Sequence, residues 1–406
     1  MSNPIDKIII LLDLPLDKRL LTILGVETLI RNGFDVEIWD LTPFFHKEFL
    51  ERIVIDGDVD FKKCKKFDNK RDIVLSLSSI SSNTIVNSFI SYQLQTYFIY
   101  HLLSKKNIKY CVVQMISFPN PPPPQKGGSI DFFRSLIKRV IALKPKHAFF
   151  GLCDKFLLKY YFLFGIRPAD IALLSGERSF EIVRDPISAK THIIWGHAWD
   201  YDIYLKERNN QIIPDPTLGI FLDEYYPLHT DYDYMGITSP IGAEEYYAKL
   251  CTFFNHLEEN YNVRIVIAAH PRSNYPESTN YFGGRPIIKG QTARLVHESS
   301  FVLAHDSTSI NFAILFRKPI IFITMDKMQK CDAGRLTTAL SIESMAHALK
   351  KTPINIDTLN EFDWPNELQI DMQSYINYQN DFIKKAGTPE IPFWEIYIKS
   401  IRQIYS

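Results

Sequence analysis

The chain has 406 residues, of which 46 are Lys or Arg and 46 are Asp or Glu, so its formal net charge is zero. This balance excludes the general attraction to nucleic acid that a strongly basic protein has. At roughly 150 residues per domain, the length predicts two domains. With 46% hydrophobic and 13% aromatic residues, the chain can build substantial cores, and no long stretch is polar enough to indicate disorder.

The first half of the chain alternates between apolar runs and amphipathic stretches. An apolar run at 7–12, an amphipathic stretch at 20–32 and a second run at 34–39 predict a β-α-β unit. Four further strands are expected, at 73–77, 109–115, 170–174 and 192–195. This alternation is typical of a parallel α/β sheet.

A second alternating series begins near residue 216, after a polar stretch that contains prolines. Its expected strands are 219–222, 264–268, 286–288, 301–304 and 319–323, and its expected helices are 243–260 and 307–316. Two more helices are expected at 370–384 and 392–404. We therefore predict one α/β domain over 1–215, a second over 216–375, and C-terminal helices over 376–406 that pack back across the domains.

Residues 132–164 form a basic and aromatic-rich segment, with seven Lys or Arg residues and one acid. Such a segment can lie on an anionic membrane surface, but its charges are too frequent for it to span a bilayer. The alternative is a pair of core-facing helices with solvated lysines. Residues 1–7 lack the features of a signal peptide, so we expect a cytoplasmic protein, at the inner face of the cell membrane if 132–164 binds lipid.

A His-Pro-Arg sequence directly follows the apolar run that begins at Arg264. Ligands of open parallel sheets bind beyond the carboxyl ends of the strands, where these residues are expected. Pro271 restricts the backbone of His270, and the planar guanidinium of Arg272 suits phosphate. The alternative is a strand-terminating turn with a solvated arginine.

Small polar residues, among them Ser307, Thr308 and Ser309, lead into the expected helix at 307–316. Ser307 or Thr308 is predicted to be the N-cap, and the amide groups, hydroxyls and positive dipole end of such a helix start favour an anion. The alternative is an ordinary capped helix. If the strands before the two motifs are neighbours, a phosphate-bearing ligand accounts for both.

The order of the motifs resembles a known superfamily. The second half of the chain is similar to the nucleotide-binding domain of GT-B glycosyltransferases in the order of four motifs. These are His-Pro, Gly-Gln-Thr-x-x-Leu-Val from Gly290, His-Asp-Ser-Thr-Ser-x-Asn-Phe-Ala from His305, and Lys318-Pro319. That resemblance implies an α/β fold of two Rossmann-like domains with a cleft between them. Within the superfamily, residues 216–325 resemble bacterial sialyltransferases, polysialyltransferases and related capsule and lipooligosaccharide enzymes.

The resemblance implies a metal-independent glycosyltransferase without a cofactor, which moves a sugar from a nucleotide donor to a surface-glycan or glycolipid acceptor. The implied donor is a CMP-activated nonulosonic acid, such as sialic, legionaminic or pseudaminic acid, or CMP-Kdo. Domain 216–375 would hold the nucleotide and domain 1–215 the acceptor, and His270 would meet the phosphate and ease departure of CMP. The implied nucleotide-binding residues are His270, Pro271, Arg272, Gln291, Thr292, Ser307, Thr308 and Ser309.

The related enzymes carry paired acids followed by glycine, one of them the general base, and this sequence has no such motif. Its nearest acidic pair, Asp223-Glu224, opens the second domain and so is assigned to the wrong side of the cleft. We expect Asp13 or Glu177, each after an expected strand, to be the base. The alternative for each is a solvated loop acid.

His197, Trp199 and Asp200 form a polar and aromatic cluster that we expect to bind the acceptor sugar, with the indole of Trp195 or Trp199 stacking on the sugar ring. The alternative is a buried aromatic corner. Asp-x-Asp patterns occur only as often as chance predicts in a chain with 46 acidic residues, so no metal ligand is predicted.

Two other functions remain open from the sequence. A UDP-sugar 2-epimerase shares the GT-B scaffold and has a similar serine-rich helix start before Lys-Pro. A non-catalytic protein of the same fold that binds glycan or lipid is the other alternative.

Overall fold

The computed structural model describes residues 4–50, 61–119, 145–229, 232, 238–276, 278–329, 338–358 and 363–406. These residues form two compact units. The described residues of the first unit lie within 4–117, 145–199 and 384–406, and those of the second lie at 118–119 and within 200–383. The chain therefore returns to the first unit at its C-terminal end.

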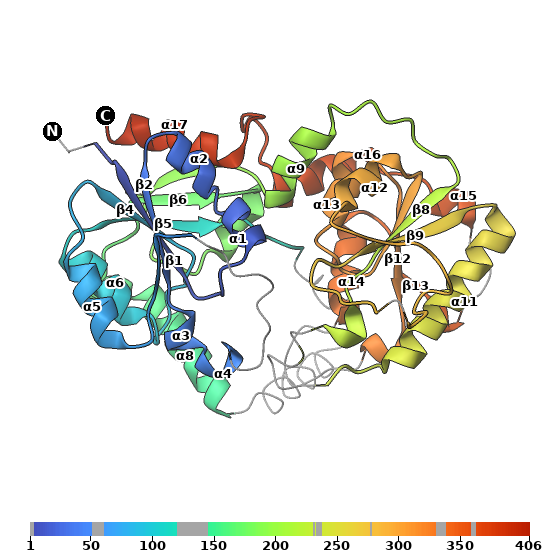
Figure 1. Ribbon diagram of the computed structural model, residues 1–406, viewed down its shortest axis with the longest axis horizontal. Coiled ribbons are helices and arrows are strands. Elements are labelled where there is room, and N and C mark those ends of the chain that lie inside the picture. The colour runs from blue at the N-terminus through green and yellow to red at the C-terminus, as the bar shows by residue number, and fades with distance from the viewer. Residues whose placement is uncertain are drawn as a thin grey trace, which may run out of the picture. The chain divides into compact units, whose positions relative to one another are not determined.

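The first unit is built on a parallel sheet with the strand order β3-β2-β1-β4-β5-β6-β7 (Figure 1). Its strands are β1 Lys7–Leu12, β2 Asp35–Asp40, β3 Cys64–Lys66, β4 Thr84–Ser88, β5 Lys109–Gln114, β6 Ile171–Leu174 and β7 His192–Trp195. The chain places β2 and β3 on one side of β1 and the later strands on the other. The direction of the strand order thus reverses between β1 and β4, which is where open α/β sheets bind ligands.

Helices cover both faces of this sheet. They are α1 Lys18–Ile23, α2 Val26–Arg31, α3 Thr42–Phe45, α4 Lys47–Leu50, α5 Lys70–Ser78, α6 Tyr97–Lys105, α8 Pro145–Lys159 and α17 Phe393–Ile404. Successive residues of β1 point to opposite faces, so Ile8 and Ile10 join one core and Ile9 and Leu11 the other. Both faces are buried, which explains why the strand sequence is continuously apolar.

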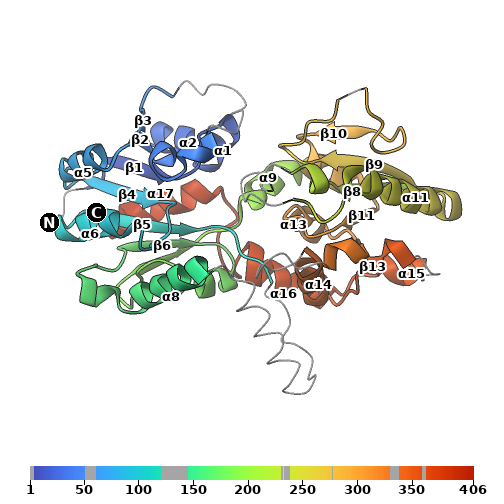
Figure 2. The same ribbon diagram turned by 90° about the horizontal axis from the view of Figure 1, so that it is seen from below.

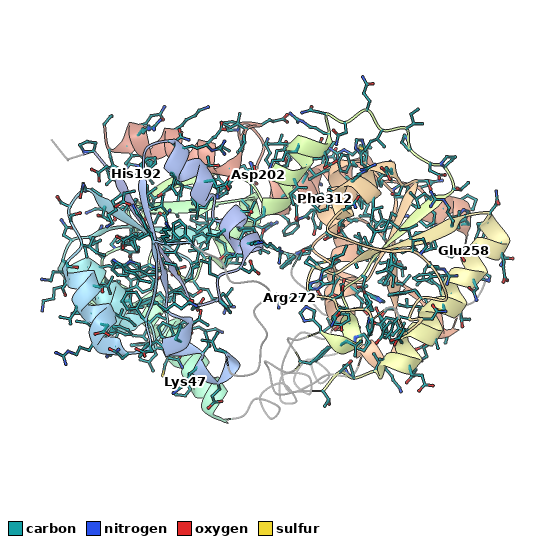
Figure 3. The ribbon with its side chains drawn as sticks, in the orientation of Figure 1. Lys47, His192, Asp202, Glu258, Arg272 and Phe312 are labelled. Carbon is teal, nitrogen blue, oxygen red and sulfur yellow. The ribbon has the colours of Figure 1, made fainter. Side chains whose placement is uncertain are left out.

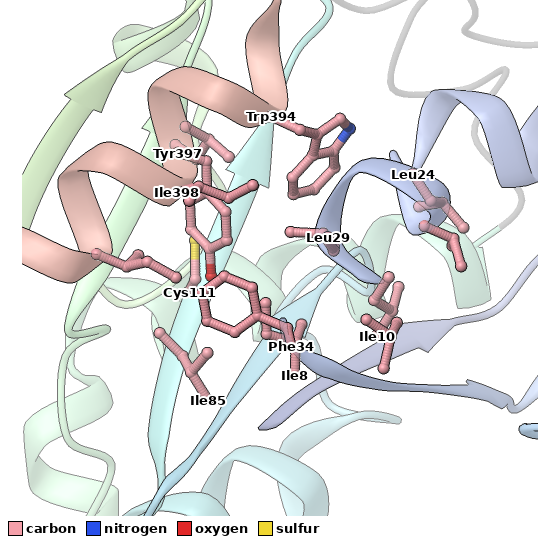
Figure 4. Close-up of a cluster of buried hydrophobic side chains, with 14 of the residues drawn as sticks. Ile8, Ile10, Leu24, Leu29, Phe34, Ile85, Cys111, Trp394, Tyr397 and Ile398 are labelled. Carbon is pink, nitrogen blue, oxygen red and sulfur yellow. The ribbon is translucent and has the colours of Figure 1, made fainter. Parts of the chain in front are cut away.

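The C-terminal helix α17 completes one of these cores. Figure 4 shows Trp394, Tyr397 and Ile398 packed over side chains of the sheet and of α2. The Trp394 indole N–H donates to the carbonyl of Ile23 at 2.7 Å, and the Tyr397 hydroxyl donates to Asn87 Oδ1 at 2.6 Å. The last residues of the chain are therefore part of the same core as its first strand.

The second unit has a parallel sheet with the order β10-β9-β8-β11-β12-β13. Its strands are β8 Leu218–Leu222, β9 Arg264–Ala269, β10 Ile287–Lys289, β11 Phe301–Ala304, β12 Ile320–Thr324 and β13 Ile354–Asn355. Its helices are α9 Trp199–Glu207, which begins at the boundary, α11 Ala243–Tyr261, α12 Thr292–Glu298, α13 Ile310–Leu315, α14 Thr338–Ala348, α15 Trp364–Glu367 and α16 Met372–Tyr378. In chain order the sheet reads 3-2-1-4-5-6, the Rossmann arrangement, with its reversal between β8 and β11.

The prediction of two Rossmann-like α/β units, as in GT-B proteins, is confirmed. The strand expected at 73–77 is wrong, because those residues lie in α5, whose N-cap Asn69 accepts a hydrogen bond from the Asp72 N–H at 3.0 Å. The single helix expected at 20–32 is divided into α1 and α2. Within the basic segment 132–164, residues 132–144 lie outside the described residues.

Gly25 lies between α1 and α2 and has φ +61°, a left-handed conformation that suits glycine. A Cβ atom built on Gly25 would lie 2.0 Å from Trp394 Cδ1. The break between the two helices therefore makes room for the indole of α17.

We expect Gly25→Ala to lower the free energy of unfolding by about 3 kcal/mol, because left-handed strain and overpacking against Trp394 add. Gly33→Ala is the matched control, since Gly33 has φ +89° but a Cβ atom added to it would have no neighbour within 4 Å. We expect that variant to lose about 1–2 kcal/mol, from strain alone. Denaturant unfolding measures both losses, and equal losses would mean that the approach of Trp394 is unimportant.

Candidate functional site

The site is built at the carboxyl edge of the second sheet, where three adjacent strands end. β8 pairs with β9 on one side and with β11 on the other. The strands that carry the His-Pro and Ser/Thr motifs are therefore not neighbours, since β8 separates them. The residues that follow β8, Asp223 and Glu224, consequently lie between the two predicted phosphate-binding motifs.

Asp223 ties the end of β8 to the turn after β9. Its side chain is 3% exposed and accepts hydrogen bonds from the N–H groups of Tyr225 at 2.8 Å and His270 at 3.2 Å, and from the Tyr275 hydroxyl at 2.9 Å. Burial raises the pKa of Asp223, and these hydrogen bonds oppose that rise. The carboxyl group thus holds the His-Pro turn in place.

One contact of His270 assigns the tautomer of its ring. The Arg272 N–H donates to Nδ1 at 3.2 Å, so in the neutral ring the proton is assigned to Nε2, which can donate to an anion. The carbonyl of His270 accepts from the Ser273 hydroxyl at 2.7 Å. The ring packs edge to face against His229, with 4.8 Å between centroids. The next two residues, Pro271 and Arg272, are exposed, and Figure 3 shows Arg272.

The Ser/Thr turn after β11 has a different cap from the predicted one. Ser309, not Ser307 or Thr308, is the N-cap of α13, and no side chain caps the helix. The Ser307 hydroxyl accepts from the Ser309 N–H at 3.3 Å, while Thr308 is exposed. The N-cap prediction is therefore wrong because the chain turns once more before the helix begins, which leaves Thr308 at the surface of the turn.

Asn311, in the first turn of α13, reaches across to α9. Its amide donates to Asp200 Oδ2 at 2.9 Å. The carboxylate of Asp200, a predicted acceptor-binding residue, thus contacts the helix that follows the Ser/Thr turn.

His305 is the first residue of the second motif, and it is part of the core. It is fully buried, with Nδ1 2.7 Å from the Ile323 carbonyl oxygen and Nε2 3.0 Å from the Tyr246 hydroxyl. Burial lowers the pKa of His305. A neutral ring that donates from Nδ1 and accepts at Nε2 satisfies both contacts, so His305 supports the turn rather than a ligand.

Glu224 and Asp306 form an acid pair between the two motifs. Glu224 Oε1 is shielded from solvent and has no hydrogen-bond partner within the described part of the chain. Burial, and then the charge of Asp306, raise the pKa of Glu224 well above its ordinary value. Glu224 therefore keeps its proton at pH values where an exposed glutamate is ionised, and the pair carries less negative charge than two carboxylates would.

Gln291 and Thr292 follow β10 at the same edge of the sheet. Gly290, with φ +79°, turns the chain after the strand, and Gln291 is the exposed N-cap of α12. Because β10 pairs only with β9 in the sheet order, these two residues lie on the side of His270 that is remote from the Ser/Thr turn.

The two predicted base candidates lie at the carboxyl edge of the first sheet. Asp13 is the residue after β1, and its Oδ2 is 3.9 Å from His46 Nε2. Glu177 follows β6 and pairs with Lys385, whose Nζ lies 3.1 Å from Glu177 Oε1. The sequence motifs did not indicate either partner.

His197 and Trp199 were expected to contact the acceptor. His197 is fully buried, with its ring nitrogens 3.1 Å from the Ala198 carbonyl oxygen and 3.0 Å from that of Ile391. This environment fits the alternative of a buried corner. Trp199 is half-buried, and its indole N–H points to the sulfur of Met115.

Sequence reasoning missed Glu224, His229 and His46 as members of these two edges. A signal for Glu224 was present, since it follows a buried strand just as His270 does. His229 and His46 lie several residues beyond their strands, so only the folded loops bring them to the edge. Among the described residues, no group of three or more His, Cys, Asp or Glu side chains is arranged to hold a metal ion.

No protein-family model matches the chain, and no curated protein matches it in sequence. Several solved structures are similar. A UDP-N-acetylglucosamine 2-epimerase aligns at 12% identity over 99% of this chain and 96% of its own, with a TM-score of 0.46. The wall teichoic acid polymerase TagF aligns at 11% over 100% and 91%, with a TM-score of 0.48. MurG from Acinetobacter baumannii aligns at 10% over 98% and 95%, with a TM-score of 0.41. Similarity at this level does not identify an activity.

The raised pKa of Glu224 predicts a pH-dependent change in stability. Between its ordinary pKa and the raised one, the unfolded chain releases this proton and the folded chain keeps it, so stability falls as pH rises. Glu224→Gln removes that loss. We expect the melting temperature of the variant, relative to wild type, to increase from pH 5 to pH 8.

Glu259→Gln is the matched control, because Glu259 is exposed on α11 of the same unit. Its melting temperature relative to wild type should stay constant over the same pH range. If the melting temperature of Glu224→Gln relative to wild type were also constant over this pH range, Glu224 would be ionised in the folded protein.

Proposed function

We propose that this protein is a metal-independent glycosyltransferase that moves a sugar from a nucleotide donor to a surface-glycan acceptor. The proposed donor is CMP-activated nonulosonic acid or CMP-Kdo, bound by the second unit. One observation carries the proposal: the His-Pro-Arg turn and the Ser/Thr turn end the two strands on either side of β8, at the reversal point of a Rossmann sheet.

The chemistry of this edge suits a phosphate. His270 offers an Nε2–H donor, Arg272 adds a permanent positive charge, and the hydroxyls of the Ser/Thr turn add neutral donors. A protonated Glu224 does not repel a phosphate as a carboxylate would, and its O–H group can donate a hydrogen bond. The acid pair is therefore compatible with an anionic ligand.

In the proposed reaction, an acceptor hydroxyl attacks the anomeric carbon of the donor as the bond to the CMP oxygen breaks. Negative charge grows on the departing phosphate, where His270 and the Ser/Thr turn stabilise it. The hydroxyl proton passes to a base of the first unit. Asp13 and Glu177 are the candidates from the sequence.

The acid pair favours one alternative, a UDP-sugar 2-epimerase. Such an enzyme has to act without an acceptor, and a carboxyl group that keeps its proton, as the raised pKa of Glu224 indicates, can serve as proton donor. Incubation with UDP-N-acetylglucosamine alone separates the two functions, since only an epimerase converts it without an acceptor.

Calorimetry with CMP, UDP and GDP tests the donor assignment. We expect CMP to bind most tightly, and His270→Ala to weaken CMP binding by about tenfold or more, the effect of losing one hydrogen bond to a charged group. His192→Ala is the control, because His192 is exposed on β7 of the first unit (Figure 3). Tight binding of UDP with none of CMP would refute the donor, and unchanged affinity in His270→Ala would refute the site.

We also propose that α8 attaches the protein to the cytoplasmic face of an anionic membrane. The described part of this region is α8 and the 3₁₀ helix Tyr161–Phe164 after it. Leu157 of α8 belongs to the same core as Ala172 and Leu174 of β6, and Figure 2 shows α8 at the outside of the first unit. Its outer surface exposes large apolar side chains, namely Phe150 at 45%, Leu152 at 68%, Phe156 at 53%, Phe162 at 60% and Leu163 at 69%.

The charges around this surface favour an anionic lipid surface as its partner. Lys155 and Lys159 are exposed among the apolar side chains, whereas Asp154 accepts a hydrogen bond from the Leu94 N–H at 2.8 Å. Apolar side chains with flanking lysines are the features of a helix that lies in a membrane interface. Among the described residues, no helix has the length and apolar character to cross a bilayer.

Sedimentation with lipid vesicles tests this attachment. We expect wild type to bind vesicles that contain phosphatidylglycerol, and Leu152→Ser/Leu163→Ser to bind them at least tenfold more weakly, because two leucines lose their burial in lipid. Leu75→Ser is the control, since Leu75 is 57% exposed on α5 of the same unit. Lipid would not be the partner if the double variant bound vesicles as tightly as wild type. The same would follow if wild type were a dimer in solution and the double variant a monomer.

A further inference from the structure

We propose that His46 and Asp13 form a catalytic dyad in the first unit, in which the His46 imidazole takes the proton of the acceptor hydroxyl and Asp13 is a positioning residue. This inference rests on the proposed function and names the base that the function requires. It assigns the role to a histidine rather than to a carboxylate.

The topology brings both residues to the carboxyl ends of two neighbouring strands, β1 and β2, beside the reversal point of the first sheet. Asp13 follows β1, which lies between β2 and β4. His46 ends the short helix α3, which begins directly after β2, the neighbour of β1. The Leu41 N–H donates to the Leu12 carbonyl at 2.8 Å, which holds the ends of the two strands together.

Backbone contacts then set the place of the imidazole. Asp40 Oδ1 accepts from the Thr42 N–H at 2.9 Å and so starts α3, and the His46 N–H donates to the Thr42 carbonyl at 2.8 Å and so ends it. The ring lies 6.4 Å from the ring of Phe45. The helix is one turn long, so the direction of His46 depends directly on the end of β2.

The two side chains are close to each other and accessible. His46 Nε2 is 3.9 Å from Asp13 Oδ2, and the side chains are 28% and 33% exposed. This separation is longer than a hydrogen bond, as is common for catalytic pairs without substrate. Partial exposure lets an acceptor hydroxyl reach the pair while the carboxylate stays beside the ring.

Glu177, the other candidate, is already engaged. It pairs with Lys385, whose Nζ also lies 4.4 Å from the centroid of the Trp195 ring. To act as a base, Glu177 would have to break its ion pair with Lys385, whose ammonium group is also attracted to the face of the Trp195 ring. Asp13 has a partner that can itself accept a proton, whereas Glu177 has one that cannot.

The proposed step is balanced within the glycosyl transfer. With Nε2–H directed to Asp13, the lone pair of His46 Nδ1 takes the proton as the acceptor O–H bond breaks. The acceptor oxygen forms a bond to the anomeric carbon, and the bond between that carbon and the phosphate oxygen breaks. CMP leaves with the electron pair of the broken bond. Asp13 stabilises the imidazolium that results, as a carboxylate does for a catalytic histidine.

The test measures CMP release from CMP-N-acetylneuraminic acid with lactose as acceptor. We expect His46→Gln to lower kcat by about 10²–10⁴-fold, the contribution of a general base, with KM for the donor within threefold of wild type. Asp13→Asn should lower kcat as well, and the double variant should be no more than about threefold worse than His46→Gln, because the two residues act as a unit. Added imidazole should restore part of the activity of His46→Gly.

The outcomes separate the dyad from the proposed function. A wild-type enzyme that releases no CMP from this donor, from the other CMP-activated nonulosonic acids or from CMP-Kdo refutes both proposals. An active wild type whose His46→Gln variant keeps kcat within threefold refutes the dyad alone, as do multiplying effects in the double variant. Thermal melts identify a variant that does not fold, in which case Asp13→Asn and the imidazole rescue of His46→Gly decide. His192→Gln, at an exposed histidine of the same unit, should match wild type.

Discussion

The buried carboxyl group of Asp223 is the contact on which the arrangement of the second unit's edge depends. It joins the end of the central strand β8 to the backbone of His270 and to the hydroxyl of Tyr275. At 3% exposure, a carboxyl group without these partners would destabilise the folded protein whether charged or neutral. The turn after β9 must therefore supply hydrogen-bond donors to it. The position of the imidazole is therefore a consequence of satisfying a buried polar group, and a substitution at Asp223 would disturb folding and ligand contacts together.

Burial also sets the charge of the residues around that edge. Glu224 is the residue after Asp223, yet its neighbour is the acid Asp306, whereas Asp223 accepts hydrogen bonds from three donors. Burial raises the pKa of both groups, and the pKa of Glu224 is raised more than that of Asp223. His305 is kept neutral by the core beneath the same edge. A sheet edge with several acids and histidines is thus compatible with an anion, because the fold suppresses part of its negative charge.

The sequence predicted the strands better than the edge that they build. β7 and β11 match their predicted ranges because short apolar runs bounded by polar residues have few alternatives. The sequence of α5 predicts a strand because its short apolar run resembles one, although Asn69 before it caps a helix. The sites depend on strand order, which no local pattern encodes. The sequence places Asp223-Glu224 in the second domain, where the structure also has it, but it does not show that β8 is central and that the pair lies between the two motifs.

The return of residues 384–406 to the first unit has a consequence for how the chain folds as it is synthesised. One face of the first sheet is closed by α17, and its Trp394 fills the break at Gly25 more than 360 residues earlier in the chain. On the ribosome, the first unit consequently waits with an uncovered apolar face until the whole second unit has emerged. The second unit, most of which lies within 200–383, is free to fold before it, so residues 384–406 complete a unit whose first strand is made long before them.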